Sequence, residues 1–219
     1  MGRHNFEELK QLATKNFGMH QNRLLAQAGR SSLVDDETMA KVGSGMCATL
    51  TTYWIAEQLR DDKTGSYFRY EAPGLPAAKV KAIRTDRQAL MLSVLSPKHA
   101  RYVELRTAGD MRPGLLILAP PGVQGEAMPS MAFDDLVTFD FKAGRAYYVT
   151  LICDKARHAI GIIGQHRATL TFFDPNAGEY EIKGLLFDRF LSAYKEIIAT
   201  SLKWGQINSI VVSEASIKA

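Results

Sequence analysis

Two apolar segments separated by a short polar turn constrain the fold more than any other feature of this sequence. The segments span residues 157–163 and 168–174, and their large side chains are isoleucine, leucine and phenylalanine. The turn between them, Gly-Gln-His-Arg at 164–167, has the glycine and polar residues that typically separate two strands. The pattern therefore predicts an antiparallel β-hairpin in the C-terminal half of the chain.

The register of this hairpin decides which polar side chains meet. If Gly164 lies opposite Ala168 with three residues in the loop, His158 lies directly opposite Asp174. Directly opposed residues share a face of the sheet and have Cβ atoms about 5 Å apart, so the carboxylate could hold one nitrogen of the imidazole. Pro175 then ends the pairing because it has no N–H to donate. A shift of one residue would place the two side chains on opposite faces, so this interpretation depends on the register.

A histidine held by an aspartate is part of a catalytic triad, and the two cysteines of the chain are the candidate nucleophiles. Cys153 lies within the apolar segment 147–153 and is predicted to be a small core residue. Cys47 follows Gly-Ser-Gly-Met at 43–46 and precedes the amphipathic run 48–59, so we expect it at the start of a helix. The partial positive charge of a helix N-terminus lowers the pKa of a thiol. Without a histidine partner, Cys47 could equally be a buried structural thiol.

Three parts of the sequence resemble the YopT-type (YopT/AvrPphB-like) papain-like cysteine protease effectors. Gly45-Met46-Cys47-Ala48-Thr49-Leu50, followed by Trp54, resembles the nucleophile block of that family, Gly-x-Cys-x-x-Leu with a later Trp. Phe173-Asp174-Pro175-Asn176-Ala177-Gly178-Glu179-Tyr180 resembles its acid block, Phe-Asp-Pro-Asn-x-Gly-Glu-aromatic, and is the more specific match. His158 lies between the two blocks, and the resemblance covers roughly residues 43–182. Trp54 itself is predicted to pack in the core.

The resemblance implies a fold, a site and an activity. The fold would be papain-like and α+β, with the nucleophile at the N-terminus of a central helix packed on an antiparallel sheet. Cys47 would be the nucleophile, His158 the general base and then acid, and Asp174 the carboxylate that orients the imidazole. The protein would be a thiol endopeptidase without metal or cofactor. It would be a secreted bacterial effector or toxin, exported by a non-Sec route, that cleaves specific proteins such as host signalling proteins in the cytosol of a target cell.

The sequence assigns only half of an oxyanion hole. The backbone N–H of Cys47 at the helix start is a natural donor, and loss of one such donor costs about 3 kcal/mol in comparable enzymes. Papain-like enzymes place an amide side chain five or six residues before the nucleophile, where this chain has Lys41 and Val42. The residue that supplies the second oxyanion donor is therefore not assigned from the sequence. The remaining candidates are Ser44, Gln21, Asn22 and Gln27.

The order of the predicted elements, helices first and sheet second, is typical of an α+β protein. The hydrophobic periodicity predicts helices at 5–17, 21–28, 47–58, 76–95 and 186–201. Strands are expected at 115–118, 145–153, 157–163, 168–174, 179–183 and 207–212, with a loop at 119–131. Residues 133–141 fit either a helix or a pair of strands.

Length and composition suit one soluble globular domain. The 219 residues are expected to form a single papain-like protease domain, with an N-terminal helical segment at about 1–35 and a catalytic core at about 36–219. No apolar run approaches the roughly 20 residues of a membrane helix, and no apolar core of a Sec signal is visible at the N-terminus. Two cysteines in such different contexts argue against a disulfide framework.

Charge bears mainly on the expected partners. The 27 Lys and Arg against 23 Asp and Glu give a modest, scattered excess of +4, which fits a solvated surface or attraction to an acidic or membrane-proximal substrate. No basic cluster with interleaved aromatic residues predicts nucleic-acid binding. A protein substrate is the expected partner, and a secretion chaperone or an inhibitor protein could be a second one.

Two other classes of function stay open at this point. A Cys-His-Asp site can also catalyse transglutamination, deamidation or amidase reactions on cell-wall peptides. The chain could alternatively be a non-catalytic interaction module that keeps the fold. The target could lie in a eukaryotic host or in a competing bacterium.

Overall fold

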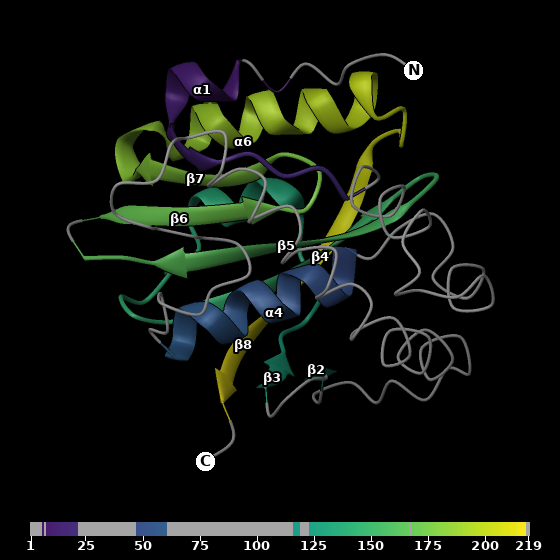
Figure 1. Ribbon diagram of the computed structural model, residues 1–219. Coiled ribbons are helices and arrows are strands. Elements are labelled where there is room, and N and C mark those ends of the chain that lie inside the picture. Colours follow the sequence, from purple (N-terminus) through teal and green to yellow (C-terminus); the bar gives the residue numbers. More distant parts are fainter. Residues whose placement is uncertain are drawn as a thin grey trace, which may run out of the picture.

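One antiparallel sheet organises the part of the chain that the computed structural model describes, which is residues 6, 8–21, 47–60, 116–118, 123–166 and 168–217. In these residues eight strands pair in the order β1-β7-β6-β5-β4-β8-β3-β2 (Figure 1). The strands are β1 Thr14–Phe17, β2 Leu116–Leu118, β3 Val123–Ala127, β4 Ala146–Cys153, β5 Arg157–Gly164, β6 Thr169–Asp174, β7 Gly178–Lys183 and β8 Ile207–Ile217. The helical elements are α1 Leu9–Leu12, α4 Cys47–Arg60, η1 Phe133–Val137, η2 Gly184–Leu186, α6 Phe187–Glu196 and the π-helix η3 Ile197–Ser201.

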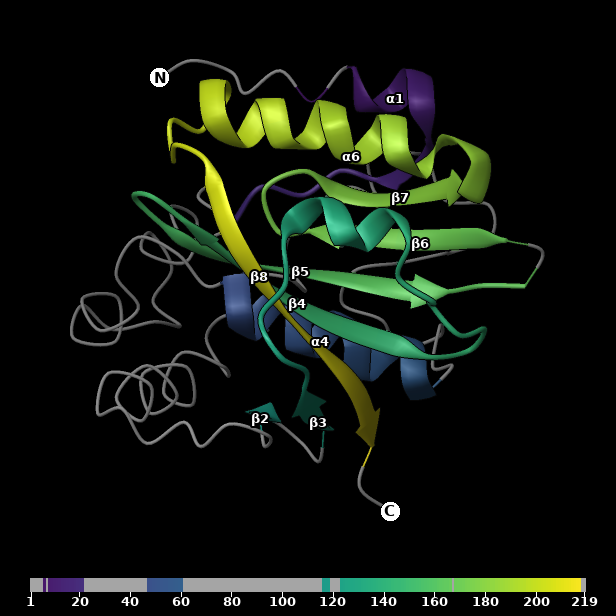
Figure 2. The ribbon, with the colours of Figure 1, turned by 180° about the vertical axis from the view of Figure 1, so that it is seen from behind.

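Helices pack against both faces of the sheet. The helix α4 lies against one face, and α6 together with η1 lies against the other, as the two opposite views show (Figure 1, Figure 2). The predicted α+β class is therefore confirmed. The predicted strands at 145–153, 157–163, 168–174 and 179–183 are present with shifts of one residue at their ends. Among the described residues, no helix has the length and apolar character needed to cross a membrane.

Two segments were predicted wrongly because pairing with distant strands overrides their local pattern. The helix expected at 5–17 is confined to α1, and residues 14–17 form β1, which pairs with β7 through Thr14 opposite Glu181. The loop expected at 119–131 contains β3, a segment of low strand propensity that pairs with both β2 and β8. The strand expected at 207–212 continues to residue 217, and this extension supplies the partner of β3.

The register predicted for the central hairpin was wrong by two residues. Gly164 lies opposite Leu170 rather than Ala168, so His158 and Asp174 are not directly opposed. The loop sets this register. Ala168 has a φ of 53° and lies in the left-handed region, which three-residue hairpin loops require at their last position. Ala168 therefore ends the loop and does not begin β6. A shift of two residues preserves the alternation of side chains, so His158 and Asp174 still share a face and are diagonal neighbours.

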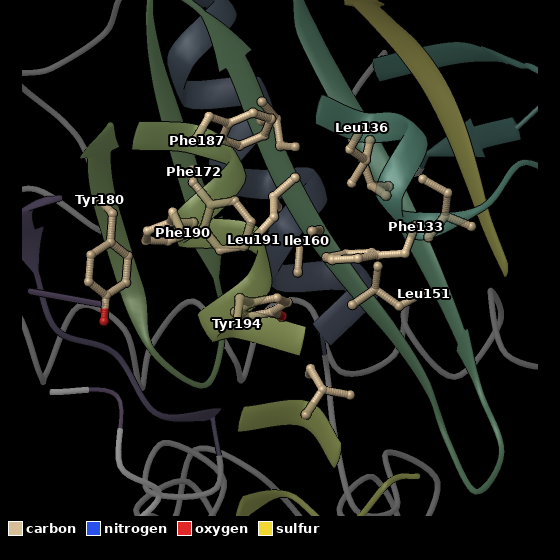
Figure 3. Close-up of a cluster of buried hydrophobic side chains, with 14 of the residues drawn as sticks. Phe133, Leu136, Leu151, Ile160, Phe172, Tyr180, Phe187, Phe190, Leu191 and Tyr194 are labelled. Atoms are coloured by element: carbon tan, nitrogen blue, oxygen red, sulfur yellow. The ribbon is translucent and has the colours of Figure 1, made fainter. Parts of the chain in front are cut away.

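Aromatic side chains fix α6 on its face of the sheet. The ring of Phe172 on β6 lies 5.0 Å, centroid to centroid, from the rings of both Phe190 and Tyr194 on α6. Figure 3 shows these three rings together in the core. Full burial of each such side chain contributes about 2–3 kcal/mol, so α6 holds a fixed position above β6. Cys153 is buried in this core, as predicted.

Several predictions fall on parts of the chain that the structure does not describe. They are the helix at 21–28 beyond Gln21, the helix at 76–95, and the oxyanion candidates Lys41, Val42, Ser44, Asn22 and Gln27.

Candidate active site

His158 and Asp174 form a buried hydrogen-bonded pair. The imidazole Nε2 lies 2.9 Å from Oδ1 of Asp174, and the two residues are 2% and 0% exposed. An ionised carboxylate can only accept, so Nε2–H of His158 donates. The predicted contact is therefore present, although it runs diagonally between the strands and not straight across them. The imidazole is long enough to span this diagonal.

The thiol of Cys47 is electrostatically coupled to the same imidazole. Cys47 is half-buried and is the first residue of α4, as its position in the sequence predicted. The imidazole of His158 lowers the pKa of this thiol, and the thiol in turn raises the pKa of His158. Since Nε2 of His158 is bonded to Asp174, Nδ1 is the nitrogen left for the sulfur. This contact is possible at the end of the sheet, where α4 and β5 begin and β6 ends. The structure thus brings the three predicted site residues together.

The electrostatics of this cluster favour a thiolate beside an imidazolium. Burial raises the pKa of the Cys47 thiol, but the charge and hydrogen bond of His158 outweigh it, and the pKa lies below its ordinary value. The backbone N–H groups of Ala159 and Ala48 lower it further. Burial would lower the pKa of His158, yet the negative charges of Asp174 and Cys47 raise it to about 10.

Contacts of α4 with β5 and β6 fix the position of Cys47. Thr51, one turn after Cys47, donates from Oγ1 to the carbonyl oxygen of Ala159 at 3.1 Å. Trp54 is fully buried and stacks on Phe173, with ring centroids 5.0 Å apart and an interplanar angle of 10°. The core packing predicted for Trp54 is confirmed. The thiol and the imidazole therefore belong to two elements that are joined next to the site.

Thr51→Val is expected to destabilise the protein by about 1 kcal/mol, because a net intramolecular hydrogen bond of this kind contributes about that much. The substitution keeps the shape of the side chain but removes the donor to Ala159. Urea unfolding of the two proteins measures the difference. Thr52→Val is the matched control on the same helix, because Thr52 bonds only back along α4 to the carbonyl of Ala48 among the described contacts. Equal stability of the two variants would contradict the assigned role of Thr51.

Glu179 connects the acid block to α4, a contact that the sequence analysis did not foresee. Its side chain is fully buried on β7. Oε2 accepts a hydrogen bond of 2.7 Å from Nε1 of Trp54, and Oε1 accepts one of 2.7 Å from Nδ2 of Asn16 on β1. The glutamate of the motif therefore links β7 to the helix that carries Cys47 and to the N-terminal strand.

The turn after Asp174 is held by the segment around β1. The backbone N–H of Asn176 donates to Oδ1 of Asp174 at 2.6 Å, and Nε2 of Gln21 donates to the side-chain oxygen of Asn176 at 2.9 Å. Gly178 has a φ of 109°, and a Cβ there would lie 2.1 Å from the carbonyl oxygen of Phe17. These contacts favour asparagine at position 176 and glycine at position 178. They also show that Gln21, an oxyanion candidate, has its amide bonded to Asn176.

Trp204 covers the imidazole of His158, and no sequence signal marked it. The ring centroids lie 4.9 Å apart with an interplanar angle of 55°. Trp204 follows the π-helix η3, and its carbonyl oxygen accepts a hydrogen bond of 3.0 Å from the backbone N–H of Lys155 in the turn before β5. The next residue, Gly205, has a φ of 81°, and a Cβ there would meet the Asp154 side chain at 2.4 Å. The chain after η3 is thus fixed against the β4–β5 turn, with the indole over His158.

Comparisons with known proteins find similarity to solved structures only, and at low identity. No family model and no curated protein matches the chain. The solved structures that are similar to it include the following two. The Pseudomonas avirulence protein AvrPphB is 14% identical with a TM-score of 0.44, and the match covers 88% of this chain and 100% of that one. PatoxP, a cysteine protease-like domain of the Photorhabdus asymbiotica toxin PaTox, is 13% identical with a TM-score of 0.49, over 96% of this chain and 56% of that one.

The first of these structures is one of the YopT-type effectors that the sequence motifs resemble. At this level of similarity neither structure supplies an argument for the function of this chain. The side-chain geometry around Cys47 carries that argument instead.

Proposed function

We propose that this protein is a papain-like cysteine endopeptidase of the YopT type, with Cys47 as nucleophile, His158 as general base and acid, and Asp174 as the orienting carboxylate. The observation that carries the proposal is the buried hydrogen bond between His158 and Asp174, together with the lowering of the Cys47 pKa by that same imidazole. A low thiol pKa at a helix start beside a charged histidine is the environment of a reactive cysteine.

The geometry supports acyl transfer through a thioester. The Cys47 thiolate attacks the carbonyl carbon of a peptide bond, and the imidazolium of His158 gives its Nδ1 proton to the leaving amine. Neutral His158 then takes a proton from water, whose oxygen attacks the thioester and releases the carboxylic acid and the Cys47 thiolate, so that the thiolate–imidazolium pair is restored. Asp174 holds Nε2–H throughout, which keeps the ring in one tautomer. We assign the backbone N–H of Cys47 as one oxyanion donor, worth about 3 kcal/mol.

We further propose that the substrate is a protein of a target cell and that the chain reaches that cell's cytosol by a non-Sec route. The basis is the resemblance of the two sequence blocks to secreted effectors. The N-terminal segment belongs to the same proposed domain as the rest, which is supported by the pairing of β1 with β7 in the common sheet.

Comparison of new protein N-termini in cells that express the wild type or Cys47→Ala tests the proposal. We expect a small set of new termini that appear only with the wild type, because peptide cleavage needs the sulfur. The same proteomes report the rival chemistry: glutamine residues deamidated or cross-linked by the wild type, without new termini, would replace the protease by a deamidase or transglutaminase. Identical proteomes for the two proteins would leave the non-catalytic module as the better account.

A further inference from the structure

The hydroxyl of Tyr194 lies directly on the carboxylate of Asp174. Oη donates to Oδ2 at 2.5 Å, and both side chains are fully buried. The ring of Tyr194 packs against Phe172 and Phe133, with centroids 5.0 Å and 6.4 Å away (Figure 3). A phenylalanine could make these ring contacts, so packing does not explain the hydroxyl.

The two carboxylate oxygens of Asp174 accept hydrogen bonds from different donors, and the hydroxyl of Tyr194 is the donor to Oδ2. Oδ1 accepts from Nε2 of His158 and from the backbone N–H of Asn176. Oδ2 accepts from Tyr194, its partner among the described contacts. A buried carboxylate oxygen has given up its hydrogen bonds to water. If it then loses its protein donor, its negative charge is left unsatisfied, which costs free energy. Tyr194 therefore completes the set of donors around this carboxylate.

Tyr194 keeps its proton while it fulfils this role. Burial raises the pKa of its hydroxyl well above the ordinary value, and the neighbouring charge of Asp174 raises it further. Burial also raises the pKa of Asp174, but the charge and hydrogen bond of His158 outweigh this and keep it low, with smaller contributions from Tyr194 and Asn176. The pair is thus a permanent donor facing a permanent acceptor.

We infer that Tyr194 is a positioning residue of the site: its hydroxyl fixes the rotation of the Asp174 carboxylate and keeps it ionised, so that His158 stays aligned with Cys47. This inference rests on the proposed function. The hydroxyl is held in place by α6, whose aromatic contacts with the sheet leave the tyrosine ring no freedom to turn away. An element that the sequence presents only as an amphipathic helix thereby takes part in the site.

The rate of alkylation of Cys47 by iodoacetamide, measured against pH in Tyr194→Phe, tests the inference. We expect the rise in rate to move up by about one pH unit, so that the rate below it falls about tenfold, since a carboxylate that can rotate no longer holds the imidazole in line with the thiol. Tyr180→Phe is the matched control, because it removes a hydroxyl from another fully buried tyrosine of the same core, next to Phe190. This control should keep the wild-type profile.

A second substitution shows whether Tyr194 acts through Asp174. In an Asp174→Asn background, Tyr194→Phe should change the alkylation profile no further. If Tyr194→Phe does not fold, site-specific 3-fluorotyrosine at position 194 keeps the packing and supplies a stronger donor, which should move the profile to lower pH.

The outcomes separate the two proposals. A wild-type profile that rises at the pH of an ordinary thiol would remove the proposed triad itself. The wild-type rate could instead rise at a pH below that of an ordinary thiol, with the same profile in Tyr194→Phe or in the 3-fluorotyrosine protein. That result would overturn the role of Tyr194 alone.

Discussion

Replacement of His158 by alanine is expected to lower the rate at which Cys47 reacts with iodoacetamide at neutral pH by about 100-fold or more. Burial raises the pKa of the Cys47 thiol, and His158 supplies the largest opposing contribution. Without the imidazole, the thiol should titrate above its ordinary value, and each unit of pKa reduces the thiolate tenfold at a given lower pH. Any peptide cleavage should be lost with it, because His158 is the group proposed to protonate the leaving amine.

The shape of the pH profile distinguishes loss of the ion pair from general damage. In the wild type the ion pair forms as pH rises through the lowered pKa of Cys47 and is lost as pH rises through the pKa of His158, about 10. Cleavage should therefore follow a bell whose basic limb lies near pH 10. In His158→Ala, alkylation should instead show a single rise at higher pH.

Two control variants make the alkylation assay specific. Cys153 is buried, and its pKa is raised to about 11 by burial and by Asp154, so a Cys153→Ala variant should react like the wild type at neutral pH. His166→Ala removes an exposed histidine at the hairpin tip, and this variant should also be alkylated at the wild-type rate. If His158→Ala reacted as fast as these controls, Cys47 would not be activated by His158.

The sequence predicted the elements that depend on local patterns and missed those that depend on distant partners. The apolar alternation of β4 to β7 and the position of Cys47 at the start of α4 are local, and both were found. The strand β1 and the strand β3 form because an edge of the sheet is available to them, which no window of sequence reveals. The hairpin register was missed for a related reason. Ala168 adopts a left-handed conformation, which in a sequence is usually indicated by a glycine.

The candidate site shows the same division. Cys47, His158 and Asp174 could be named because nucleophile, base and acid have characteristic residue types. Tyr194 and Trp204 could not, because both are aromatic residues in an apolar segment, where packing is the ordinary explanation. Only the three-dimensional contacts of their polar or aromatic groups with the His–Asp pair set them apart.

Glu179→Ala is expected to lower the free energy of unfolding by about 3 kcal/mol, the largest stability effect anticipated for a residue outside the triad. The substitution leaves Nε1–H of Trp54 buried without its acceptor and removes the partner of Asn16. It also leaves a cavity where a fully buried side chain had packed. Urea unfolding measures the effect. Glu179→Gln, which keeps one accepting oxygen, should fall between the wild type and the alanine variant.

The consequence for the site follows from what Glu179 joins. Trp54 belongs to α4, so a weaker link to β7 should let the helix shift and separate Cys47 from His158. Alkylation of Glu179→Ala at neutral pH should therefore slow even where the protein remains folded. Glu181→Ala is the matched control, because Glu181 lies two residues along the same strand and is exposed, so its loss should change stability by less than about 0.5 kcal/mol. Equal stabilities and equal alkylation rates for the two alanine variants would show that the position of α4 does not depend on the buried glutamate. The position of Cys47 would then depend, among the described contacts, on Thr51 and the stacking of Trp54.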